Sequence, residues 1–79
     1  MTEPVPFSVL CVDDEPNILL ALKRTLRPAG YQVATAAGGA EGLELLARES
    51  VDLVISDMRM PGMDGAQFLG RVRQEHPEV

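Results

Sequence analysis

Short apolar segments alternate along this chain with longer segments in which apolar residues recur every three or four positions. The short segments have strand length and β-favouring composition, whereas the longer ones have the period of an amphipathic helix. The predicted strands are 8–12, 31–35 and 51–56. The predicted helices begin at Pro16, near Ala40 and after Asp64. Strands that alternate with helices in this way indicate a parallel sheet with right-handed crossovers.

Each predicted helix has one apolar face that we expect to pack on the sheet. The expected inward positions are Ile18, Ala21, Leu22, Thr25, Leu26 and Ala29 in the first helix, Leu43, Leu46 and Ala47 in the second, and Phe68, Leu69 and Val72 in the third. Pro16 suits a first helical turn, because its missing N–H has no helical partner there. Asp64 followed three residues later by Gln67 is typical of a capping box at the start of the third helix.

Composition and charge narrow the class of protein. Of the 79 residues, 46% are hydrophobic and 24% charged, which favours a folded globular chain and a single unit over 1–79, with 1–7 as an extended lead-in. The net charge of −5 and the lack of a basic run argue against nucleic-acid binding. The only cysteine, Cys11, cannot form an internal disulfide, and no signal peptide or membrane-spanning segment is evident. These features predict a cytoplasmic protein that does not contact a membrane.

Acidic residues follow two of the three predicted strands. Asp13 and Asp14 follow the first strand and Asp57 follows the third, whereas the second ends in two alanines. If the first and third strands are neighbours, in the order 2-1-3, the three carboxylates meet where the strand order reverses, which is where open α/β sheets bind ligands. Carboxylates so close together require a counter-charge, and a hard cation such as Mg²⁺ suits them. Asp57 is therefore a candidate nucleophile or metal ligand.

Two motifs resemble the receiver domain of two-component response regulators. They are VDDEP at 12–16 and SDMRMPGMDG at 56–65, and the resemblance extends from Ser8 to the end of the chain. It implies a flavodoxin-like, doubly wound α/β fold, of which this chain holds the (βα)3 portion without the last two βα units. It also implies that Asp57 accepts a phosphoryl group from the phosphohistidine of a sensor histidine kinase.

The same resemblance implies a site for Mg²⁺. Asp14 is expected to bind the ion directly and Asp13 through water, together with Asp57 and the backbone carbonyl of Arg59. The chain is then a phosphoacceptor that takes part in its own phosphorylation and dephosphorylation, and not an enzyme in the usual sense. A C-terminal or separate output domain is expected as a partner. Family members also carry a Ser/Thr and a Lys on their fourth and fifth strands, and the only lysine here, Lys23, lies on the first predicted helix.

Two alternatives remain open at this point. One is a non-catalytic interaction or dimerisation fragment, which is expected to self-associate through the outer edge of the third strand, where no partner strand is predicted, or through the face that the family's last helix would cover. Without that helix, core positions such as Leu10 or Val54 are expected to be exposed. The other is a Mg²⁺-dependent phosphohydrolase of the haloacid dehalogenase kind, which uses a strand-end aspartate. That family requires a second acid two residues after its nucleophile, where this chain has Arg59.

Overall fold

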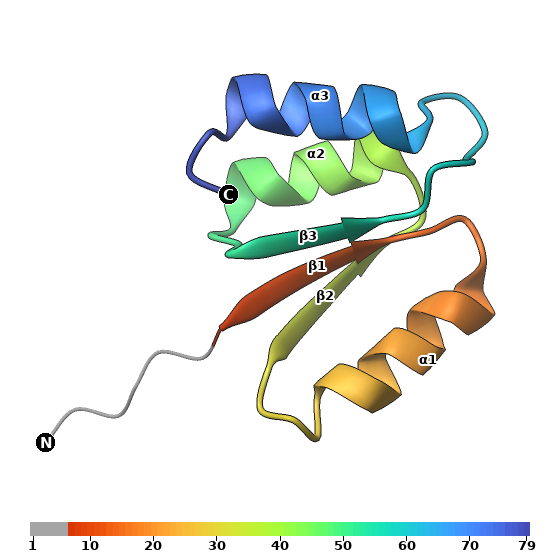
Figure 1. Cartoon of the computed structure of the whole chain (residues 1–79), viewed down its shortest axis with the longest axis vertical. Coiled ribbons are helices and arrows are strands. Elements are labelled where there is room, and N and C mark those ends of the chain that lie inside the picture. Colours follow the sequence, from red (N-terminus) through yellow and green to blue (C-terminus); the bar gives the residue numbers. More distant parts are fainter. Residues whose placement is uncertain (1–6) are drawn as a thin grey trace, which may run out of the picture.

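The computed structural model describes residues 7–79, which form a three-stranded sheet and three helices (Figure 1). The elements are β1 (Ser8–Val12), α1 (Pro16–Leu26), β2 (Gln32–Ala36), α2 (Gly39–Arg48), β3 (Leu53–Ser56) and α3 (Gly65–Glu75). Of the predicted lead-in, residues 1–6 lie outside the described part of the chain. The carbonyl of Phe7 accepts a hydrogen bond from the Gln32 N–H at 3.0 Å, so this residue is already tied to β2. No helix in 7–79 is long and apolar enough to cross a membrane.

The three strands are parallel and lie in the order β2-β1-β3, which confirms the predicted order 2-1-3. Val12, the last residue of β1, lies beside Ala36 of β2 and Ser56 of β3. All three arrows in Figure 1 therefore point to the same edge of the sheet, where the chain turns into α1, α2 and α3. The architecture is the expected (βα)3 portion of a flavodoxin-like fold.

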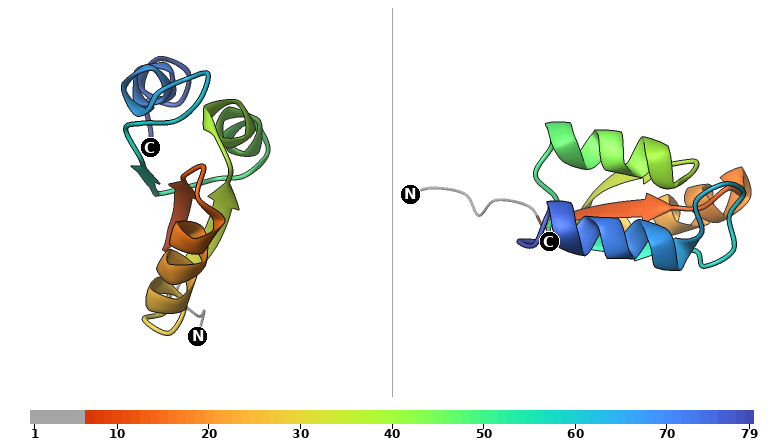
Figure 2. Two further views of the ribbon diagram at one scale, coloured as in Figure 1. Left: turned by 90° about the vertical axis from the view of Figure 1, so that its right-hand side faces the viewer. Right: turned by 90° about the horizontal axis from the view of Figure 1, so that it is seen from above.

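Helix α1 covers one face of the sheet, and α2 and α3 cover the other (Figure 2). The main core lies between the sheet and the α2–α3 layer, and Phe68 of α3 is fully buried there. The other buried members are Leu10, Val12, Ala36, Leu45, Leu46, Val51, Met60 and Val72. The prediction for Ala47 is wrong, since it is exposed while Leu45 is buried. Helix α2 turns the stripe that contains Gly39 and Gly42 toward the core, and Ala47 lies off that stripe.

The face of the sheet under α1 is only partly covered. Leu53 and Ile55 of β3 are 45% and 37% exposed, because α1 packs on β1 and β2. Ile18, expected to point inward, is 47% exposed. The prediction that Leu10 is exposed is wrong: Leu10 pairs with Val54, and both side chains belong to the α2–α3 face. Neighbouring residues of a strand face opposite sides of the sheet. The exposed side chains of β3 are therefore Leu53 and Ile55, which lie on either side of Val54 in the strand and face the α1 side.

Leu69, also expected to point inward, is 37% exposed on α3. It lines a groove of about 310 Å³ beside the outer edge of β3, together with Leu53, Val54, Val72, Arg73, Pro77 and Val79. The apolar side of α3 thus extends past the edge of the sheet.

The capping box predicted at the start of α3 is confirmed. The Asp64 side chain accepts a hydrogen bond from the Gln67 N–H, and the Gln67 side chain accepts one from the Asp64 N–H.

Candidate functional site

The acidic residues at the ends of β1 and β3 are held by hydrogen bonds that continue the sheet beyond the strands. The Asp13 N–H donates to the Ala36 carbonyl at 3.2 Å, and the Asp57 N–H donates to the Val12 carbonyl at 3.0 Å. The backbones of Asp13 and Asp57 are therefore fixed on neighbouring strands, and both side chains leave the sheet at the same edge. Asp14 follows directly in the turn to α1.

The structure brings together the three aspartates that the sequence singles out. One carboxylate oxygen from each of Asp13, Asp14 and Asp57 lies within 4.8 Å of the others. Asp13 is only 8% exposed, Asp57 is partly buried and Asp14 is exposed, so the cluster opens to solvent on one side. A ligand can enter from that side without any movement of the strands.

Two of the carboxylates are oriented by backbone amides. Asp13 Oδ1 accepts a hydrogen bond from the Glu15 N–H at 2.9 Å, and Asp57 Oδ1 accepts one from the Met58 N–H at 2.8 Å. Each uses one oxygen in this way and retains its second oxygen for a ligand. The donor set is purely oxygen and carries three negative charges when ionised, which is the chemistry that Mg²⁺ prefers. These residues therefore fit the ion that the sequence suggests.

Arg59 lies in the loop between β3 and α3 and is exposed. The role expected for its backbone carbonyl as a metal ligand stays a prediction. Gly62 in the same loop has φ +77°, which favours glycine, and it lets the chain turn back toward α3.

The loop returns to the site at Gly65, a residue that the sequence analysis named only as the last position of the 56–65 motif. The Gly65 N–H donates to the Met58 carbonyl at 3.0 Å. A Cβ atom at this position would lie 2.7 Å from Met58 Cα and 3.0 Å from the Asp57 carbonyl carbon, which is too close for any side chain. The start of α3 is thus packed directly on the Asp57–Met58 peptide. The available signal was the Asp-Gly pair itself, but a turn explains that pair equally well.

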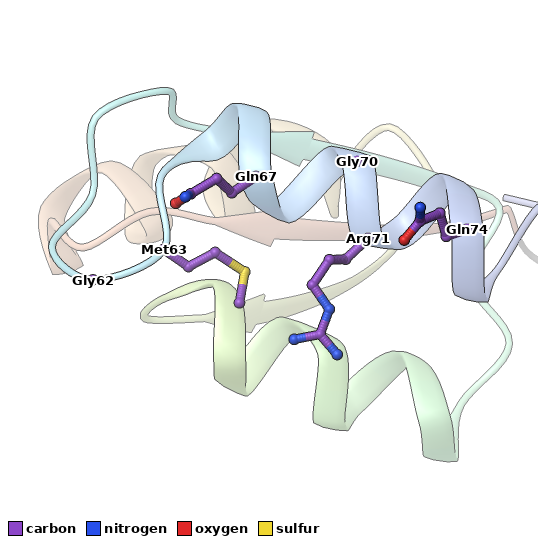
Figure 3. A pocket seen from close by; sticks show the side chains of 6 residues that line it. All are labelled: Gly62, Met63, Gln67, Gly70, Arg71 and Gln74. Atoms are coloured by element: carbon purple, nitrogen blue, oxygen red, sulfur yellow. The ribbon is translucent and has the colours of Figure 1, made fainter.

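Two further features lie outside the acidic cluster. A groove of about 620 Å³ lies along α3 and the loop before it, and Figure 3 shows two of its lining side chains, Met63 and Arg71, extending toward α2. None of the three aspartates lines this groove, and Arg71 pairs with Glu75 at 2.8 Å.

Cys11 is fully buried in β1, and burial raises the pKa of its thiol, so it behaves as a core residue and not as a nucleophile.

Comparison with protein families gives a match over almost the whole described chain. The family model of the response regulator receiver domain matches residues 9–79. The transcriptional regulatory protein GlrR of Escherichia coli (strain K12) is 50% identical over 72 residues, which are 91% of this chain and 16% of GlrR. Sporulation initiation phosphotransferase F of Bacillus subtilis (strain 168) is 40% identical over 65 residues, which are 82% of this chain and 52% of that protein.

Solved structures give the same result. The chemotaxis protein CheY4 of Vibrio cholerae superimposes with a TM-score of 0.90 at 39% identity, over 94% of this chain and 62% of that chain. The response regulator TrrA of Thermotoga maritima, in complex with Mg²⁺-BeF, superimposes with a TM-score of 0.86 at 41% identity, over 90% of this chain and 62% of that chain. The chain thus spans less than two thirds of each of these four proteins.

Proposed function

Because this chain belongs to the response regulator receiver domain family, we propose that it is a cytoplasmic, phospho-accepting receiver of a two-component system, with Asp57 as the acceptor. One observation carries the proposal: the carboxylate of Asp57, directly after β3, meets those of Asp13 and Asp14, directly after β1, at the open edge of the sheet. The expected donor is the phosphohistidine of a sensor histidine kinase. A C-terminal or separate output domain is expected to respond to the modification.

The proposed reaction is a phosphoryl transfer to the Asp57 side chain. A carboxylate oxygen of Asp57 forms a bond to phosphorus while the bond from phosphorus to the histidine nitrogen breaks, and the imidazole keeps that electron pair and takes a proton. The product is an acyl phosphate, which water can hydrolyse. The chain is then a participant in its own modification and not an enzyme with a separate substrate. The bond from the Met58 N–H holds Asp57 Oδ1, which leaves the other oxygen to attack.

Asp13, Asp14 and Asp57 are the residues that would hold Mg²⁺, with the carbonyl of Arg59 as a further ligand. When bound, the ion neutralises the negative charge that gathers as the phosphoryl group approaches the carboxylates. The Mg²⁺-BeF complex of TrrA supports this assignment by similarity. Asp13 is the more buried member of the pair, and one of its oxygens accepts the Glu15 N–H. Asp14 is exposed, which favours it as the direct ligand.

The test is labelling of the chain with acetyl phosphate and Mg²⁺, followed by intact mass and by release of inorganic phosphate over time. We expect one labile phosphoryl group per chain, lost in Asp57→Asn. Asp52→Asn is the matched control, because Asp52 is also a carboxylate beside one end of β3 that accepts a backbone N–H, from Ser8, but it is exposed and lies at the opposite end of the strand. Equal labelling of Asp57→Asn and the parent would refute the assignment, and sustained phosphate release without a detectable phosphoryl group on the chain would favour the hydrolase instead.

A second candidate function, self-association, is favoured by the outer edge of β3. Within 7–79, β3 pairs only with β1, so the N–H and C=O groups along its other side are available to another strand. The edge carries no lysine or proline that would block such pairing, and Leu53 and Ile55 flank it with exposed apolar surface. We propose that two copies join through this edge.

Light scattering on the 79-residue chain tests this directly. We expect a dimer at micromolar concentration and a monomer for Ile55→Lys, which places a charge beside the edge. Ala66→Lys, on the exposed side of α3, is the control for the added charge. A parent chain that remains monomeric at this concentration contradicts the proposal.

A further inference from the structure

We propose that Gly65 is a positioning residue for Asp57, an inference that rests on the phosphoacceptor function proposed above. Gly65 is the first residue of α3 and is buried. Its Cα lies against the peptide that joins Asp57 to Met58, close enough that an added Cβ would overlap both residues. Among the glycines of the described chain, it is the one whose missing side chain faces the backbone of the acidic cluster.

The contact matters because the same peptide orients the reactive carboxylate. The Met58 N–H holds Asp57 Oδ1 at 2.8 Å, and the Met58 carbonyl accepts the Gly65 N–H at 3.0 Å. A shift of the peptide that made room for a side chain at 65 would turn this N–H, and with it the Asp57 carboxylate. The distances from Asp57 to Asp13 and Asp14 would change as a result.

Other hydrogen bonds also restrain the Asp57–Met58 peptide, so it cannot shift without turning the Asp57 carboxylate. The Asp57 N–H is fixed to the Val12 carbonyl, and the Ser56 hydroxyl donates to the Asp57 carbonyl at 2.9 Å. On the far side, α3 is held in place by the Asp64 capping box and by Phe68, which is fully buried. A Cβ at residue 65 would therefore overlap the Asp57–Met58 backbone, and helix α3 is held too firmly to move away from it. The position requires glycine because of packing and not because of its backbone conformation, which is not left-handed.

The proposal predicts a specific loss in Gly65→Ala. We expect the labelling rate with acetyl phosphate at saturating Mg²⁺ to fall by about 10- to 100-fold, because a displacement of about 1 Å in a reacting group has effects of this size. The Mg²⁺ dissociation constant, measured by titration of backbone amide resonances, should rise by about ten-fold. The matched control is Gly70→Ala on the same helix, since a Cβ there meets nothing within 4 Å. Gly70→Ala should leave the labelling rate and the Mg²⁺ dissociation constant at the values of the parent chain.

Circular dichroism and the amide spectrum establish whether Gly65→Ala remains folded. If it is folded and both quantities match those of the parent, Gly65 has no positioning role. If it does not fold, Ser56→Ala decides, because it frees the Asp57 carbonyl without adding atoms. A several-fold slower labelling rate in Ser56→Ala then supports the proposal, and a parent rate overturns it. If the parent chain itself is not labelled, the phosphoacceptor function fails, and the Mg²⁺ titrations still test whether Gly65 orients Asp57.

Discussion

Replacing Asp57 by asparagine should stabilise the folded chain even though it removes the proposed acceptor. Asparagine keeps the Oδ1 atom that accepts the Met58 N–H, so the local hydrogen bond is retained. The change removes one negative charge from a cluster in which the three carboxylates lie within 4.8 Å of one another. Because Asp57 is distant in sequence from Asp13 and Asp14, its repulsion with them exists only in the folded state.

The size of the effect follows from Coulomb's law. Two unit charges 4.8 Å apart repel by about 0.9 kcal/mol in a medium with the dielectric constant of water. Asp57 has two such neighbours, and the cluster is open to solvent, so we expect the free energy of unfolding to rise by about 1–2 kcal/mol at low ionic strength. In about 1 M salt the screening length falls to about 3 Å, and most of the gain should disappear.

Urea unfolding of the parent and of Asp57→Asn, at low and high salt without Mg²⁺, measures this difference. Asp52→Asn is again the control, because it removes one negative charge from the chain, as Asp57→Asn does, but lies outside the cluster. Addition of Mg²⁺ at about ten times its dissociation constant should stabilise the parent by about 1.4 kcal/mol and the variant by less. If Asp57→Asn is less stable than the parent at low salt, or if its gain does not depend on salt, the charge-repulsion argument is wrong.

Two further predictions concern ligand binding and packing. Asp14→Ala should weaken Mg²⁺ binding more than Asp13→Ala, because Asp14 is the exposed member of the pair; equal losses in a titration would contradict this division of roles. Gly42→Ala should lower the free energy of unfolding by about 1–3 kcal/mol in urea, since a Cβ there would lie 2.9 Å from a ring carbon of the buried Phe68. Gly70→Ala, in an open helical position, should instead be neutral or stabilising by up to about 1 kcal/mol.

The features predicted correctly from the sequence are those that depend on local pattern and on strand order. The strand at Ser8–Val12 has the predicted bounds, whereas the second strand begins one residue later and the third two residues later than expected. The meeting of Asp13 and Asp57 follows from the order 2-1-3, because parallel strands end at one edge. This is why the acidic cluster could be located before any coordinates were known.

The features that the sequence did not predict depend on how closely two elements approach. The buried stripe of a helix can rotate around its axis without changing the periodicity of the sequence. In α2 it is therefore Leu45, and not Ala47, that faces the protein core. The contacts of Gly39, Gly42 and Gly65 arise from the distance between packed elements, which no local pattern encodes. The exposure of Leu53 and Ile55 likewise depends on which strands α1 covers.

The central position of β1 has a consequence for the order in which the site comes into existence. β1 is the first element of the sheet along the chain, yet it pairs with β2 after one helix and with β3 only after two. The unit from β1 to β2 can form from contacts close in sequence, whereas docking of β3 closes the longer loop and is expected to come later. β3 is also a four-residue edge strand, the kind of element that detaches first in local opening. Assembly of the three carboxylates thus requires the last docking step of the sheet, and any opening that releases β3 separates Asp57 from Asp13 and Asp14 while β1 and β2 stay paired.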